Sequence, residues 1–180
     1  MDGMNYVDHK LPFIVAGLSV INLTTTYQNL VNFTSMPVFG PNYWQYPGKA
    51  IRVRAIGLST TGATPGTLTF SFLYGPATPG SGTTLAGVSV TWTASQTNMT
   101  FIAELQVRCR TLIGGGFQGN LLAAGRMLLQ GTGLFALPPT GLAVQTVDFA
   151  QPFCIVPQAS RSGSTAESLT VQEIMYEALN

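Results

Sequence analysis

The chain has 180 residues, of which 8 are Lys or Arg and 7 are Asp or Glu, so charged residues make up only 8%. An average globular chain carries about 25%, and helical bundles and coiled coils are rich in Glu, Lys and Arg, which excludes those classes. The hydrophobic fraction of 46% excludes a disordered chain. A net charge of +1 gives no field to hold a polyanion, which excludes a non-specific nucleic-acid binder. We expect one folded domain whose surface is largely covered by copies of itself or by a larger assembly.

Residues 1–48 form a segment that prolines interrupt and that is too aromatic for a free tail. The sequence predicts an arm here that packs on its own domain or on a neighbouring subunit. Leu11–Leu23 is the longest apolar stretch, but it is far too short to span a membrane. Asp2 and Asp8 precede it, which is unlike a secretory signal peptide. The interrupting residues are Pro12, Pro37, Pro41 and Pro47, and the aromatic ones include Phe33, Phe39, Tyr43, Trp44 and Tyr46.

From residue 49 onward the chain reads as short strands separated by turn residues. Apolar side chains recur at every second position and are rich in β-branched and aromatic types, which is the strand pattern. The longest such segment has fifteen residues, which is long for one strand and predicts a bulge or a bend. The predicted strands in this half are Lys49–Leu58, Thr67–Tyr74, Val88–Ala94 and Asn98–Leu112.

The second half continues with shorter elements. Asn120–Gln130 fits a strand or a short helix, and Gly119 and Gly125 favour the strand. We predict a loop at Gly131–Pro139, a polar turn at Pro157–Ala166, and strands at Leu142–Phe149, Phe153–Val156 and Leu169–Ala178. Short strands at this spacing predict an all-β fold, an antiparallel jelly-roll-like β-sandwich over residues 49–180 that carries the N-terminal arm.

Residues that could carry chemistry are few. His9 is the sole histidine, and two distant cysteines, Cys109 and Cys154, do not complete a zinc site. The sequence has no G-x-S-x-G, and Lys10 and Lys49, its only lysines, stand in no phosphate-binding motif. We therefore predict no enzyme, no metal and no cofactor. Two buried free thiols are favoured, and a disulfide between them stays open because pairing depends on geometry.

Five charged residues gather on the polar faces of two predicted strands. Glu104 shares its face with Arg108 and Arg110, and such neighbours favour the ionised carboxylate, which is wrong for a general acid. We predict an ion pair across strands or across subunits. Arg52 and Arg54 also share a face, and they either pair with acids on a neighbouring strand or bind an acidic partner. All five are candidate charges of a subunit interface.

Aromatic residues fall into two groups. One group lies on the apolar faces of alternating strands and is predicted to form the core. Tyr43, Trp44 and Tyr46 instead cluster in a proline-rich segment. That cluster is either a plug where the arm crosses the base of the sandwich or a platform on which a sugar ring stacks. The predicted core residues are Phe70, Phe72, Trp92, Phe101 and Leu105.

Three segments together resemble a known family: Pro41–Gly75 with its Pro-Gly-Lys-Ala-Ile-Arg-Val-Arg strand, Met99–Arg110, and Leu169–Asn180 with its Glu-Ala-Leu-Asn ending. In this order they resemble jelly-roll decoration or cement proteins, small structural proteins of tailed bacteriophages found near head genes. The resemblance covers about residues 41–180. It implies a trimer on the outside of the phage head, with no catalytic residues, and with the arginine-bearing strands and the chain's end as subunit contacts.

The sequence thus predicts a non-enzymatic virion protein that decorates and stabilises the outer surface of a capsid. Its predicted partners are itself, as a homotrimer, and the major capsid protein, with no nucleic acid and no membrane. Two alternatives stay open on the same sandwich fold. One is a phage tail or fibre component. The other is a carbohydrate-binding adhesion module that would use Tyr43, Trp44 and Tyr46 to bind a glycan.

Overall fold

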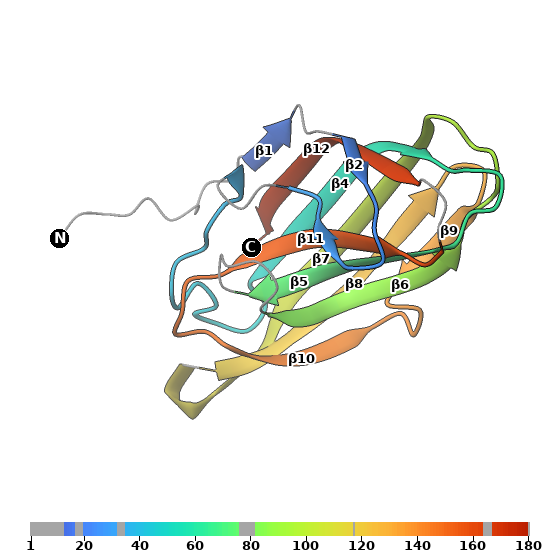
Figure 1. Ribbon diagram of the computed structural model, residues 1–180. Helices are drawn as coiled ribbons and strands as arrows, with labels where there is room; N and C mark the ends of the chain where they lie inside the picture. The colour runs from blue at the N-terminus through green and yellow to red at the C-terminus, as the bar shows by residue number, and fades with distance from the viewer. Residues whose placement is uncertain are drawn as a thin grey trace.

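The protein is an antiparallel β-sandwich (Figure 1). The computed structural model describes residues 13–16, 20–31, 35–75, 82–116, 118–163 and 167–179. Over these residues the regular structure is strand, apart from 3-10 structure at Ser35 and in η2 (Gly114–Gly116). The predicted all-β, jelly-roll-like class is confirmed, and none of the described helical structure is long and apolar enough to cross a membrane.

The larger of the two sheets has eight strands, which we call the large sheet. Its main path runs β1-β12-β4-β7-β8-β10, with β2 also pairing β12 and β9 also pairing β8. Every pairing in it is antiparallel. The strands are β1 (Phe13–Ala16), β2 (Val20–Asn22), β4 (Ala50–Thr60), β7 (Met99–Ile113), β8 (Gln118–Leu129), β9 (Gly133–Leu137), β10 (Ala143–Asp148) and β12 (Ser168–Leu179).

The small sheet has four strands in the order β3-β11-β5-β6, and in Figure 1 it lies in front of the large one. Its strands are β3 (Gln28–Asn29), β5 (Thr67–Gly75), β6 (Thr83–Thr91) and β11 (Cys154–Arg161). The core fills the space between the two sheets, because both turn their apolar positions inward. The five predicted core residues lie there, each with 4% or less of its surface exposed: Phe70, Phe72, Trp92, Phe101 and Leu105.

Strands with clean alternation form where the sequence places them. In β4 the side chains of Ile51, Val53 and Ala55 are buried, while Arg52 and Arg54 between them are half-buried on the other face. β7 has fifteen residues and the predicted irregularity, because its register against β8 shifts between Cys109 and Thr111. Arg110 is the extra residue at this bulge.

Two predictions for the second half are wrong. Residues 157–161 are not a turn but the end of β11, where Gln158 is buried and its Nε2 donates to Ser71 Oγ at 3.0 Å. The polar residues misled the prediction because their partners lie on β5, far away in the sequence. The predicted loop at 131–139 contains β9, which pairs with β8 through Gly133–Leu137. Asn120–Gln130 is a strand, within β8.

The N-terminal segment adds strands to both sheets, none of which the sequence predicted. β1 and β2 lie along β12, and β3 lies along β11. Arg161, at the end of β11, also contacts this segment. Its Nε donates to the Leu23 carbonyl, and its Nη1 lies 3.0 Å from Oε2 of the fully buried Glu167. Residues 1–12, with His9, lie outside the described residues, and so does the path of that part of the arm.

Candidate functional site

The aromatic cluster at residues 43–46 is a plug at one end of the sandwich. Trp44 is 1% exposed and stacks on Phe153, with ring centroids 5.7 Å apart, and Tyr43 packs edge-on against Trp44 at 5.1 Å. Lys49 Nζ lies 4.0 Å from the centroid of the Tyr43 ring, which is a cation–π contact. Of the three predicted residues only Tyr46 is exposed, at 48%. The burial of Tyr43 and Trp44 fits the plug, and Tyr46 is the member of the cluster whose ring is open to solvent.

The backbone fixes this plug between the two sheets. The Asn42 amide donates to the Phe149 carbonyl at 2.7 Å, and the Gly48 amide donates to the Cys109 carbonyl at 2.8 Å. Phe39 forms an isolated bridge with Phe153, and their rings stack at 5.1 Å. These bonds connect the segment to the start of β11 and to the end of β7. The plug is thus part of the domain's own core.

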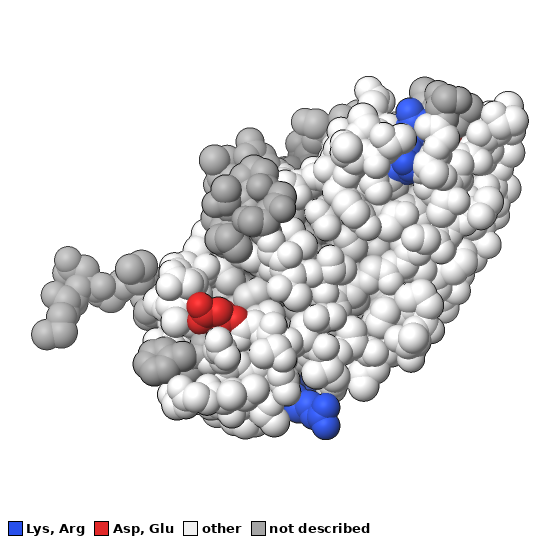
Figure 2. Space-filling model, turned by 60° about the horizontal axis from the view of Figure 1, so that its bottom comes forward, with Lys and Arg blue, Asp and Glu red and all other residues white. Residues whose placement is uncertain are grey.

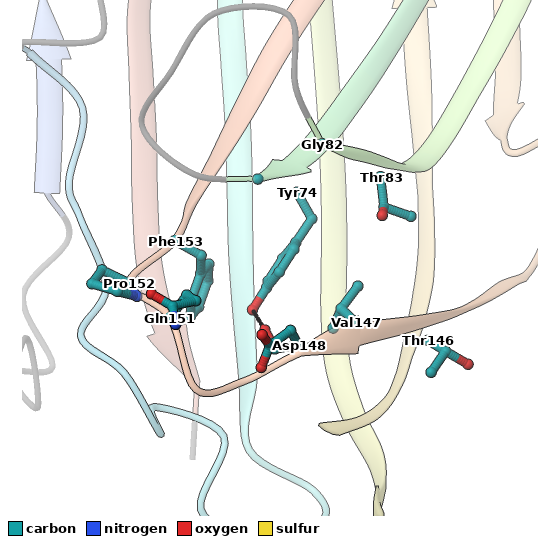
Figure 3. A pocket seen from close by; sticks show the side chains of 10 residues that line it. Tyr74, Gly82, Thr83, Thr146, Val147, Asp148, Gln151, Pro152 and Phe153 are labelled. Atoms are coloured by element: carbon teal, nitrogen blue, oxygen red, sulfur yellow. Dashed lines mark hydrogen bonds between the residues drawn. The ribbon is translucent and has the colours of Figure 1, made fainter. Parts of the chain in front are cut away.

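A cleft of about 330 Å³ opens beside the plug, where β5 ends, β6 begins and β10 ends (Figure 3). That volume is within the range of small-ligand sites. Gly82 is needed at its rim, because its φ is +152° and a Cβ there would lie 2.5 Å from the Tyr74 carbonyl oxygen. The lining residues are Tyr74, Gly75, Gly82, Thr83, Thr146, Val147, Asp148, Gln151, Pro152 and Phe153.

Two groups of this cleft are held in place. The Tyr74 hydroxyl donates to the Asp148 carbonyl at 3.2 Å, and Tyr74 stacks on Phe153 with centroids 4.5 Å apart. Burial raises the pKa of Tyr74 above its ordinary value, so the phenol stays protonated as a donor. Asp148 Oδ1 accepts from the Ala150 amide at 2.8 Å, while the side chain is exposed. The cleft therefore combines one accessible carboxylate with a mostly apolar wall.

A second surface is the side of the large sheet that faces away from the small sheet, which we call the outward face. The predicted interface charges of β4 and β7 lie on it. Arg52 pairs with Glu177 of the neighbouring β12, with Nη1 and Oε2 3.0 Å apart. Glu104 lies opposite Arg54 on one side and Arg126 on the other, away from the Arg108 and Arg110 of its own strand.

The outward face also carries exposed apolar side chains. The exposed fraction of Leu134 on β9 is 65%, and those of Ile14 on β1 and Val144 on β10 are 50% and 44%. Further inward, Ile56, Ile102 and Leu128 are partly exposed in one row across β4, β7 and β8. Apolar residues at alternating outward positions of a wide sheet are typical of a surface that binds protein.

Groups for metal or thiol chemistry are sparse in the described part of the chain. No set of three or more His, Cys, Asp or Glu residues lies close enough there to hold a metal ion. Cys109 and Cys154 are both free and buried, so the open question of a disulfide is answered: they do not pair. Burial raises the pKa of the Cys154 thiol to about 11, and its Sγ lies 3.5 Å from the Gly75 carbonyl oxygen. Such a thiol is structural.

Comparison with known proteins finds no matching family model and no matching curated protein. Solved structures match weakly. Lectin I-B4 from Griffonia simplicifolia, in its metal-free form, is 9% identical with a TM-score of 0.40, over 98% of this chain and 96% of that chain. The lectin from Bauhinia forficata in complex with GalNAc is 11% identical with a TM-score of 0.40, over 98% and 95%.

A third match is the CBM2 module of the evolved Dit of Lactobacillus casei BL23 phage J-1. It is 11% identical with a TM-score of 0.31, over 78% of this chain and 66% of that chain. Likenesses at this level carry no argument about what the present chain binds. The function has to be argued from the chain's own surfaces.

Sequence reasoning did not find the cleft. Its residues come from three segments, around 74–83, 146–148 and 151–153, and they form no motif. Asp148 has no sequence neighbours that mark it as a site residue. The pairing of Cys154 with Gly75 across β11 and β5 brings the segments together, and this long-range register has no local signal. By contrast, Arg52, Arg54 and Glu104 were recognised because alternation alone places them on one face.

Proposed function

We propose that this chain is a non-catalytic structural protein of a phage virion, which decorates the outer surface of the capsid and stabilises the shell. The outward face of the large sheet carries this proposal, because it is broad, exposed and partly apolar. The rest of the surface is poor in charge: on the side drawn in Figure 2, coloured atoms form only small, separate spots. The resemblance of residues 41–180 to phage decoration proteins supports the same role.

The physical mechanism is cementing. A protein that binds the assembled shell but not its separated subunits adds its binding free energy to the assembled state. When one oligomer contacts several capsid subunits, weak single contacts suffice, because each later contact is intramolecular. The resemblance predicts three copies in such an oligomer, whereas the charge pattern of the outward face favours two. The mass of the purified protein in solution tests the number of copies independently of the capsid role.

Particles that lack this protein are expected to release their DNA at a lower temperature than complete particles. The measurement is dye-detected DNA release during heating, with purified protein added back to the deficient particles. Adding back Leu134→Glu is expected to restore less, because a charge replaces the most exposed leucine of the outward face. Thr91→Glu is the matched control, since Thr91 is exposed on the small sheet. Equal release from complete and deficient particles would rule out the cement role.

Location is tested in the same particles. Antibody labelling of intact virions is expected to mark the head surface. Labelling of the tail or its fibres would instead support the tail alternative, which the sandwich fold serves equally well. The outward face would then be a contact within the tail.

The cleft supports a second candidate, a carbohydrate-binding adhesion module. An exposed carboxylate at Asp148, beside Gln151, Thr83 and a largely apolar wall, could accept sugar hydroxyls and cover the apolar side of a sugar ring. This places the alternative away from Tyr43 and Trp44, which are buried.

For this candidate, a glycan array should give a signal that Asp148→Asn abolishes while the protein stays folded. Asparagine keeps the shape of the side chain and removes only the charge. Glu173→Gln is the matched control, because it removes one charge from β12 on the large sheet, outside the cleft. A folded wild-type protein that binds no glycan would count against the module.

A further inference from the structure

The two central strands of the large sheet, β4 and β7, carry opposite charges side by side on the outward face. Arg54 of β4 lies directly opposite Glu104 of β7, and one row further Ile56 lies opposite Ile102. On either side of this central pair, β12 lies next to β4 and β8 lies next to β7, and shorter strands lie beyond them. The face therefore has one charged row and one row that is apolar on β4, β7 and β8 and carries Glu173 on β12, both centred on the line between β4 and β7.

Neither central charge makes an ion pair within 4 Å in the described part of the chain. Glu104 makes no ion pair there, although Arg54 and Arg126 flank it in register. Arg54 also makes none, and its Nε is buried without a hydrogen-bond partner. Partly buried charges without partners cost stability, and a partner that brings the opposite charges removes that cost.

We propose that the outward face binds a second copy of this chain, about a twofold axis that runs along the strands between β4 and β7. A twofold contact is reciprocal, so if one residue meets another, the second meets the first on the other side. This axis places Arg54 against Glu104 of the partner subunit, and Glu104 against the partner's Arg54. It places Ile56 against Ile102 of the partner subunit in the same way. The inference rests on the proposed function and assigns the outward face to the contact between copies, so that the capsid meets another part of the dimer's surface.

The size of the face suits a stable dimer. The six strands of the main path have 4 to 15 residues each, and at ~4.8 Å between strands and ~3.3 Å per residue they cover at most about 950 Å² per copy, or ~1,900 Å² in total. Specific interfaces bury about 1,600 Å². The exposed Ile14 on the β1 side would meet the β9 side of the other copy, since Ile14 and Ala136 end the same row. Packed sheets align to within about 30°, which keeps the central rows in contact.

The face also has a hollow that the second copy can fill. A depression of about 130 Å³ is lined by Gln106, Arg108, Leu122, Ala124 and Leu142, on the β7–β8 side. The same axis brings the β12–β4 side of the partner over it, where Glu177 and Arg52 form their ion pair. The Glu177 carboxylate would thereby approach Arg108, which adds a second site of complementary charge. A net charge of only +1 lets two copies approach without long-range repulsion.

The test is the mass of the full chain in solution, by sedimentation equilibrium or light scattering up to about 100 µM, because interfaces of this size bind from micromolar to picomolar. We expect a dimer. Arg54→Glu and Glu104→Arg should each raise the dissociation constant about 100-fold, since each opposes like charges twice. The double variant Arg54→Glu/Glu104→Arg should dimerise again. Thr91→Glu, on the small sheet, should change nothing.

A cross-linking experiment does not depend on the charge reversals, so it still tests the dimer if a reversal destabilises the fold. Ile102→Cys should join two chains through a short bismaleimide, because facing sheets lie ~10 Å apart. Thr91→Cys should not, and the native cysteines are buried. A monomer at every concentration, or a trimer, would overturn the proposal. So would a dimer that neither charge reversal weakens and that Ile102→Cys does not cross-link. A dimer that does not bind particles would leave this proposal standing and defeat the capsid role.

Discussion

Replacing Trp44 with alanine is expected to lower the free energy of unfolding by about 3–5 kcal/mol, the usual cost of removing a buried large aromatic side chain. Trp44 is 1% exposed, and its ring contacts Tyr43, Phe149 and Phe153. The cavity left behind would open the end of the sandwich where the strands do not close it. For a chain of this length, the melting temperature should fall on the order of 10 °C. Denaturant unfolding followed by far-UV circular dichroism measures the loss.

Two further variants at the plug separate packing from other effects. Trp44→Phe should cost less than Trp44→Ala, because phenylalanine keeps most of the buried ring and leaves a smaller cavity. Tyr46→Ala should stay within about 0.5 kcal/mol of wild type, since Tyr46 is 48% exposed. If Trp44→Ala and Tyr46→Ala cost the same, the segment is not a plug.

The second large effect is expected at the Arg161–Glu167 ion pair. Arg161→Met should lower the free energy of unfolding by about 3–5 kcal/mol, because it leaves the buried Glu167 without its arginine. The Glu167 side chain is 0% exposed and that of Arg161 is 15% exposed. The variant also removes the donors to the carbonyls of Leu23 and Gly163. The double variant Arg161→Met/Glu167→Leu should recover much of the loss, since no buried charge remains.

The Arg52–Glu177 pair is a matched control for this effect. Its Nη1–Oε2 distance is also 3.0 Å, but its side chains are 39% and 32% exposed. Arg52→Met should therefore cost about 1 kcal/mol or less. Thermal melts of Arg161→Met, Arg161→Met/Glu167→Leu and Arg52→Met, run in parallel, measure the difference between the buried and the exposed pair. Equal losses for Arg52→Met and Arg161→Met would show that burial does not set the strength of the inner pair.

The fold was predictable where one face of a strand is buried and the other is not. β4, β7 and β12 satisfy this condition, and the sequence places them and β5 to within about two residues, although residues 70–75 of β5 are buried on both faces. β11 does not, because Pro157, Gln158 and Ser160 are buried along with its apolar residues. Burial on both faces erases the alternation, and a hydrogen bond to Ser71 replaces apolar packing.

The candidate sites also differ in how far they could be predicted from the sequence. The outward face follows from alternation, so its charges could be read from the sequence, although their partners could not. Glu104 was expected beside Arg108 and Arg110, yet the register places it between Arg54 and Arg126. The cleft depends on strand ends and a connecting segment that are far apart in the sequence and meet only in the folded chain. The aromatic segment could be recognised from its composition, and only the packing shows Trp44 to be inside.

The position of β12 in the large sheet has a consequence for folding. It is the last strand of the described chain, yet it pairs with β4 on one side and with β1 and β2 on the other. Until it is synthesised, β4 presents an open edge, and the first strands have no neighbour in the large sheet. Contacts this distant in sequence make folding slow, since the loop entropy is lost before the contacts form. The nascent chain thus exposes a pairing-competent edge until β12 emerges, and this is the interval in which it is most prone to pair wrongly.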